Sequence, residues 1–276
     1  MTFSIVALSN DGQRWGVAVA SKFLAVGAIV PGVRAPFGAI ATQSFANMRY
    51  LPDGFAHLAA GLDAQATLDA LTAADDEREL RQAGVVDGSG RAATFTGAEC
   101  IPWAGGVTGN GYAIQGNILT GPEVVADMEA AYLAATGPFE RRLLAALLAG
   151  DRAGGDSRGR QSAALLVGGV GAGYGGGSDI AIDLRVDDHV DPCPELERIL
   201  GIHELIFGTP EDVRAVEGEI ATRLKAALAT LGYPTDDLAA SLFQVAGVEN
   251  LEMRLVPDGI DIHVLEHLEA LAAREV

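Results

Sequence analysis

Several segments of this chain are apolar at almost every position, and this feature limits its fold more than any other. Residues 16–20 read GVAVA and residues 162–167 read SAALLV. Short runs of this length, rich in Val, Leu and Ala and bounded by turn residues, predict β-strands. A strand with apolar side chains on both faces must be covered on both sides. We therefore expect two stacked sheets with helices on the outside.

Most of the predicted strands come in hairpins. An Asn-Asp-Gly turn at 10–12 separates residues 3–9 from residues 14–21, and both flanking segments have strand character. Such a turn between two strand-like runs is a strong hairpin signal. Residues 27–44 predict two more strand pieces with a turn at Pro31–Gly32. Residues 83–97 predict a further hairpin with its turn at Asp87–Gly90. The other predicted strands lie in residues 105–119, 160–169 and 180–188.

Helical patterns are grouped between the hairpins and do not follow each strand. Residues 53–74 predict two short helices broken at Gly61. Residues 121–136 and 138–150 predict two further helices, each with a proline in its first turn, where proline is well tolerated. A last helix is expected over residues 194–206. This order indicates an α+β fold with antiparallel sheets, because alternating βαβ units are absent.

A boundary is predicted after Gly208, which gives a domain over residues 1–208 and a module over residues 209–276. Residues 209–232 predict one amphipathic helix with Thr209 as its N-cap and Pro210 in its first turn. Two shorter helices follow, at residues 236–247 and 261–273. The module is therefore expected to contain three helices.

The charge and the cysteines exclude several classes of function. The net charge is −18, whereas nucleic acids and anionic membranes bind basic surfaces. The uncharged residues 100–122 are interrupted by Gly, Asn and Gln, which favours buried strands over a membrane helix. No signal peptide is recognised, and Cys100 and Cys193 stand alone. We expect a cytoplasmic protein with no cofactor, no metal, no nucleic-acid partner and no membrane partner.

A resemblance to a known family rests on seven segments, which are residues 2–7, 16–35, 38–47, 100–105, 115–119, 159–167 and 182–189. Together they resemble the DUF1028 family, which is placed structurally among the N-terminal nucleophile (Ntn) hydrolases. The resemblance implies a four-layer αββα sandwich and hydrolysis of an amide-type bond. The tail, at residues 224–234 and 243–255, resembles a peptidoglycan-binding-like module that is often appended to this family.

Thr2 is the candidate nucleophile that this resemblance implies. Removal of Met1 would leave Thr2 with a free amine, whose reference pKa of about 8 suits a general base at neutral pH. A nearby cation would lower that pKa further, and Lys22 and Arg34 are the candidates. The plain alternative is a small polar residue at position 2 with no catalytic role.

Two polar segments are candidates for binding the substrate or its oxyanion. The first, at the end of a predicted strand, contains Thr42, Gln43 and Ser44, and the second contains Gln115 and Asn117. An oxyanion is commonly stabilised by backbone N–H groups or by an amide side chain. Each of these residues could instead be a structural amide or a turn residue.

Other chemistries and a second class of function stay open. His57 with Cys100 could form a nucleophilic pair, and the aspartates of residues 183–191 could bind a metal. We favour an amidohydrolase that cleaves a small acyl-amide or a short peptide. The alternative is a catalytically inactive protein that binds a cell-wall fragment or a protein partner. A homodimer is compatible with an apolar-rich, acidic chain of this kind.

Overall fold

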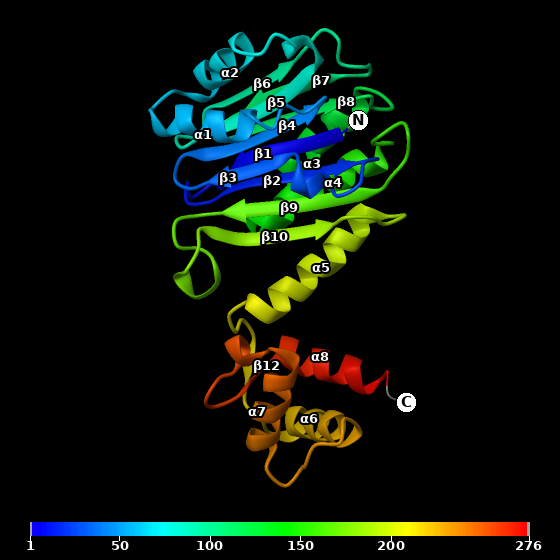
Figure 1. Cartoon of the computed structure of the whole chain (residues 1–276). Helices are drawn as coiled ribbons and strands as arrows, with labels where there is room; N and C mark the ends of the chain where they lie inside the picture. Colours follow the sequence, from blue (N-terminus) through cyan, green and yellow to red (C-terminus); the bar gives the residue numbers. More distant parts are fainter. Residues whose placement is uncertain (1, 275–276) are drawn as a thin grey trace. The chain divides into compact units, whose positions relative to one another are not determined.

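The computed structural model describes residues 2–274, and the chain divides into two compact units (Figure 1). The first unit comprises residues 1–197 and the second residues 198–276. Helix α5 (Pro192–Phe207) contains the division between them. The boundary that the sequence predicts, after Gly208, directly follows the end of this helix.

A six-stranded antiparallel sheet forms the centre of the first unit. Its order is β10-β9-β2-β1-β8-β7, so the N-terminal strand β1 lies between β2 and β8. The residues of β1 and β2 are almost entirely buried, as expected for strands that are apolar on both faces. The strands are β1 (Thr2–Leu8), β2 (Trp15–Ser21), β7 (Gly105–Gly109), β8 (Tyr112–Asn117), β9 (Ser162–Gly168) and β10 (Ile180–Val186).

A second antiparallel sheet has the order β3-β4-β5-β6. Its strands β4 and β5 contact β1, so the two sheets pack against each other. The side chains of Val6, Val17 and Val19 meet those of Ala39, Ala41 and Val86 in the core. The strands are β3 (Pro31–Arg34), β4 (Gly38–Ser44), β5 (Arg81–Asp87) and β6 (Ala92–Thr96).

The turn expected at Pro31–Gly32 is wrong. Strand β3 begins at Pro31, and the chain turns later, between Arg34 and Gly38. Because β3 is an edge strand and Pro31 is its first residue, the missing N–H of proline costs no hydrogen bond inside the sheet.

Two pairs of helices cover the sheets. Helices α1 (Tyr50–Ala59) and α2 (Ala64–Ala73) pack on β4, β5 and β6. Helices α3 (Glu123–Ala134) and α4 (Phe139–Arg152) pack on the sheet that contains β1 (Figure 1). The structure therefore confirms an α+β fold with antiparallel sheets.

The second unit has its own apolar core, formed by α6 (Gly218–Thr230), α7 (Leu238–Glu249) and α8 (Ile262–Ala272). The single helix expected over residues 209–232 is wrong in its first part. Residues 213–214 form strand β11 (Val213–Arg214), which pairs with β12 (Ile260–Asp261), and α6 begins only at Gly218. Strand pairing with residues far along the chain therefore replaces the local helical preference, and Thr209 is not its N-cap.

A buried ion pair joins separate segments of the second unit. The side chain of Arg254 is 4% exposed and that of Asp261 is fully buried, with 2.5 Å between Nη1 and Oδ2. Arg254 also donates to the carbonyl oxygens of Leu205 and Glu204 at 2.7 Å, in the last turn of α5. Asp261 accepts from the backbone N–H of His263 and so caps α8.

No helix within residues 2–274 has the length and apolar character that a membrane crossing requires.

Candidate active site

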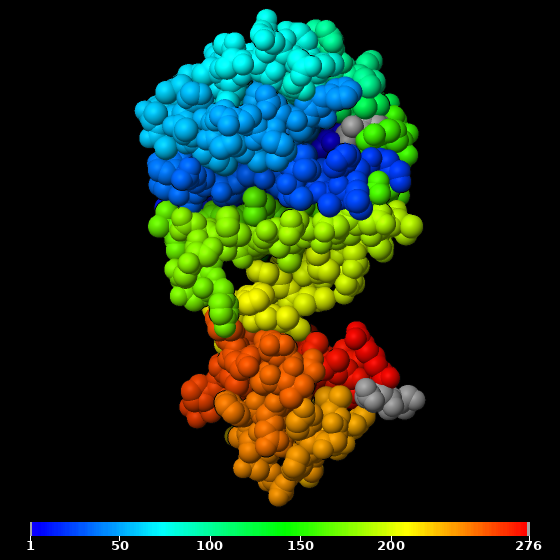
Figure 2. Space-filling view, in the orientation of Figure 1, coloured from blue at the N-terminus to red at the C-terminus, as the bar shows by residue number. Residues whose placement is uncertain are grey.

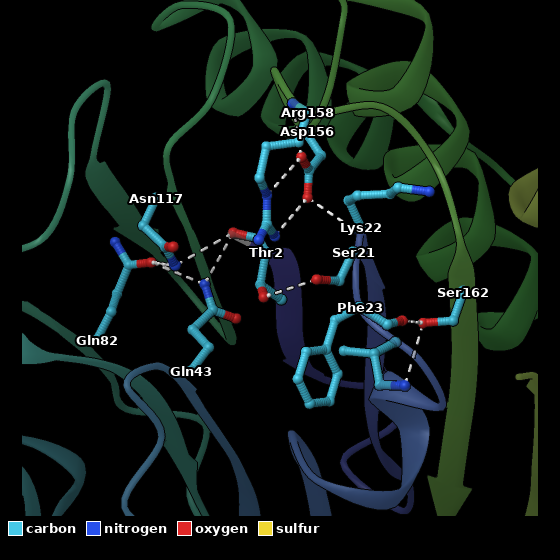
Figure 3. Close-up of polar contacts among 11 residues, drawn as sticks. Thr2, Ser21, Lys22, Phe23, Gln43, Gln82, Asn117, Asp156, Arg158 and Ser162 are labelled. Carbon is cyan, nitrogen blue, oxygen red and sulfur yellow. Dashed lines mark hydrogen bonds and ion pairs between the residues drawn. The ribbon is translucent and has the colours of Figure 1, made fainter. Parts of the chain in front are cut away.

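Thr2 opens strand β1, and its hydroxyl is paired with a second hydroxyl. Thr2 Oγ1 lies 3.2 Å from Oγ of Ser21, the last residue of β2 (Figure 3). On its other side, Thr2 is directly opposite Asn117 of β8. Residue 2 is 6% exposed, and later segments of the chain surround this dark-blue beginning in Figure 2. The central position of β1 is what brings these three strand ends together.

Amide side chains between the two sheets hold the Thr2 backbone. The Thr2 carbonyl oxygen accepts from Nε2 of Gln43 at 3.3 Å and from Nδ2 of Asn117 at 3.5 Å. The same two amide nitrogens donate to Oε1 of Gln82, at 2.8 and 2.9 Å. Because these donors are already used inside the protein, Gln43 and Asn117 position β1 and are not aimed at a substrate oxyanion.

Gln115 belongs to the same network through Ser4 and Gln43. Its Nε2 donates to Oγ of Ser4 at 2.6 Å, and Ser4 donates to Oε1 of Gln43 at 2.7 Å. A Cβ at Gly84 would lie 2.1 Å from Oε1 of Gln115, so only glycine leaves room for this amide. Gln115 thus helps to orient Gln43 by way of Ser4.

One atom of the network lacks a partner. Oδ1 of the fully buried Asn117 accepts no hydrogen bond among the described residues. Its orientation is fixed, because Nδ2 faces two acceptor oxygens and a flipped amide would place acceptor against acceptor. A buried unsatisfied acceptor is costly, so this position beside Thr2 suits an additional N–H donor.

The structure brings Lys22 to the site through its backbone and not through its ammonium group. The Lys22 N–H donates to Oδ2 of Asp156 at 2.6 Å, while its side chain is exposed and points away from Thr2 (Figure 3). Asp156 also binds the guanidinium of Arg158, with 3.3 Å between Nη2 and Oδ2. That guanidinium points toward Thr2 in Figure 3.

Sequence reasoning missed Asp156, Arg158 and Gln82. Asp156 lies 134 residues beyond Lys22, so no local pattern connects them. The only signal was the charged, glycine-rich run GGDSRGR at residues 154–160, directly before strand β9.

Three predicted site residues are not brought to Thr2. Arg34 is exposed and pairs with Gly38, at the end of β4 opposite to Gln43. Thr42 is the neighbour of Gln43 and points to the other face of the strand, where its hydroxyl donates to the Asn47 carbonyl. Ser44 ends β4 with a φ of 70° and leads into the turn before α1.

A salt bridge fixes this turn after β4. The carboxylate of Asp75 accepts from Nε of Arg81 at 3.0 Å and from Nδ2 of Asn47 at 2.8 Å, and Arg81 also donates to the Phe45 carbonyl. Burial raises the pKa of Asp75, but the hydrogen bonds from Arg81 and Asn47 outweigh it and hold that pKa well below its usual range.

We expect Asp75→Asn to lower the free energy of unfolding by about 1–3 kcal/mol at pH 7, because charge-assisted hydrogen bonds are lost. The lowered pKa means that the stabilisation is complete above the unfolded pKa of about 3.9 and is lost as the pH falls below it. Urea unfolding at several pH values measures this difference. Asp53→Asn, in the exposed pair with Arg49, is the matched control and should change stability little. If the difference in the free energy of unfolding between the wild type and Asp75→Asn stayed constant down to pH 2, it would contradict the role given to the Asp75 carboxylate.

The alternative chemistries gain no support from the geometry. Cys100 is buried and its thiol donates to the Arg81 carbonyl, and burial raises the pKa of this thiol. A reactive cysteine needs a lowered pKa. Within residues 2–274, no three side chains of His, Cys, Asp or Glu are grouped to hold a metal.

Comparison with known families and structures gives consistent matches. Residues 2–196 match the model described as "Family of unknown function (DUF1028)", and residues 206–268 match "Putative peptidoglycan binding domain". The crystal structure of protein SPO2555 from Silicibacter pomeroyi, described with the family model DUF1028, is 30% identical with a TM-score of 0.66. The match covers 80% of this chain and 92% of that chain. No curated protein matches.

Proposed function

Because this chain belongs to the DUF1028 family, whose function its description leaves open, we propose an activity from the site itself: an Ntn amidohydrolase with Thr2 as nucleophile. We also propose that the two packed sheets, each covered by a pair of helices, form the four-layer αββα sandwich of such enzymes. The substrate is a small acyl-amide or a short peptide.

The environment of Thr2 is the main support for this proposal. Its hydroxyl pairs with that of Ser21, and the residue directly opposite, Asn117, presents a buried acceptor without a donor. After removal of Met1, the new α-amine of Thr2 would supply that donor. An N-terminal amine held by Asn117 would lie on the same residue as the hydroxyl that it must deprotonate.

The chemistry follows from these groups. The neutral amine takes the proton of Thr2 Oγ1 as this oxygen attacks the amide carbonyl, and then gives it to the departing nitrogen. The resulting ester on Thr2 is hydrolysed by a water that the same amine activates. Arg158, oriented by the 3% exposed carboxylate of Asp156, is the cation that we propose to stabilise the oxyanion.

The first test is the state of the N-terminus. We expect intact-mass spectrometry of the natively expressed protein to show loss of Met1, which lies outside the described residues. Methionine removal is needed because the amine of Thr2 is otherwise part of a peptide bond. A mass that retains methionine in most molecules would contradict the proposal. A screen of acyl-amides with detection of the released amine would then identify a substrate.

The second unit supports a second candidate function. Its match to a peptidoglycan-binding description favours a protein that recognises a cell-wall fragment, with or without chemistry at Thr2. Binding of soluble muropeptides to the full chain, measured by calorimetry, tests this candidate. Binding without amide hydrolysis by the processed protein would favour it over the enzyme.

A further inference from the structure

A cavity of about 360 Å³ opens in the first unit beside Ser21. Its wall includes the start of β1, the end of β2, the end of α4 and the loop that follows α4. This volume is near the lower end of small-molecule sites, which suits a ligand of amino-acid size. Because Ser21 both lines the cavity and pairs with Thr2 Oγ1, the cavity reaches to within one side chain of the proposed nucleophile.

Two carboxylates in the cavity wall already have cationic partners. Asp151 accepts from Nε of Arg160 at 2.7 Å, and its side chain is largely buried. Asp156 accepts from Arg158 and from the Lys22 N–H. Their negative charge is therefore compensated within the protein and is not available to attract a ligand cation.

Arg152 gives the cavity an uncompensated positive charge. It lies in the last turn of α4, lines the cavity, and makes no ion pair with any residue from 2 to 274. In a protein with a net charge of −18, surplus positive charge at a cavity is a specific feature. A guanidinium matches a planar carboxylate with two parallel hydrogen bonds.

We propose that Arg152 binds the carboxylate of the substrate in this cavity, which makes N-acyl amino acids the substrate class. This inference rests on the proposed function. Water is added across the C–N bond: the acyl group passes through the ester on Thr2 and leaves as a carboxylic acid. The amino acid leaves with the proton delivered to its nitrogen, and its carboxylate is the group held by Arg152.

Binding is measured in the Thr2→Ala protein, so that no ligand is consumed. The probes are N-acetylglycine, N-acetyl-L-alanine and N-acetyl-L-leucine. Each is compared with its neutral C-terminal carboxamide, and binding is detected by ligand-observed NMR at pH 7. We expect at least one carboxylate to bind about tenfold or more tightly than its carboxamide. Adding Arg152→Gln should remove this preference and leave the affinity for the carboxamide unchanged.

Arg49→Gln is the matched control, since it removes the same charge from the exposed start of α1 and should leave the preference intact. Absence of binding by every carboxylate, or an unchanged preference in Arg152→Gln, would overturn the subsite. The proposed function fails separately. If carboxylates bind through Arg152 but the processed wild-type protein never cleaves them, the subsite stands and the Thr2 chemistry does not.

Discussion

Replacing Thr2 by alanine is expected to lower amide hydrolysis on the order of a thousandfold or more, because the covalent route disappears with the hydroxyl. The amine, Asn117 and the amide network would all remain, since the carbonyl that Gln43 and Asn117 hold belongs to the backbone. The rate is measured with the substrate found by the amine-release screen. Thermal unfolding should shift modestly, since the change removes one methyl group and the hydroxyl that pairs with Ser21.

Thr2→Ser is the matched control for this experiment. Serine keeps the hydroxyl at the same position and should retain part of the activity, whereas alanine should not. Both residues are small, and the mass of each variant must show that Met1 has been removed before the rates are compared. Turnover by Thr2→Ala at the wild-type rate would place the nucleophile elsewhere and leave residue 2 as an ordinary strand residue.

Local turn chemistry made most of the first unit predictable. The Asn-Asp-Gly turn at 10–12 and the one at Asp87–Gly90 each specify a hairpin from a few adjacent residues, and the observed strands agree. The prediction failed in two places. At Pro31 the turn was placed too early, because the chain turns between Arg34 and Gly38. At Val213 pairing with the distant strand β12 decides the conformation, and a local pattern does not reveal such pairing.

The site was predictable only in its strand-end residues. Thr2 was predicted from the resemblance, and Gln43 and Asn117 were predicted as polar residues in or next to predicted strands. The roles of the two amides differ from the expected ones, because their nitrogens already donate to Gln82, which lies in another hairpin. The candidate cations, Lys22 and Arg34, were sought on strands that follow Thr2 directly along the chain. Arg158 is instead oriented by a carboxylate that only tertiary folding brings to Lys22.

The second large effect is expected in the other unit, where Arg254→Leu should lower the free energy of unfolding of residues 198–276 by about 3–5 kcal/mol. Leucine would leave the carboxylate of Asp261 buried without its partner. It would also remove the hydrogen bonds that the Arg254 side chain donates to the carbonyl oxygens of Leu205 and Glu204 at the end of α5. Breaking one side of a buried pair costs more than the pair itself contributes, because an unpaired buried charge remains.

The sequence allows the two units to be followed separately. Both tryptophans, Trp15 and Trp103, lie in the first unit, so tryptophan fluorescence reports that unit alone. During urea unfolding, we expect Arg254→Leu to leave the fluorescence transition in place. Hydrogen exchange of α6, α7 and α8 should accelerate in the same protein, since their shared core then opens more often.

Arg214→Leu is the matched control, because it breaks an exposed pair with Asp212 in the strand beside Asp261. Exposed pairs contribute about 0–1 kcal/mol, so this variant should keep near wild-type exchange protection. Equal protection in the Arg254 and Arg214 variants would show that the buried pair does not determine stability. A shifted tryptophan transition in Arg254→Leu would show instead that the first unit depends on the second for its folding.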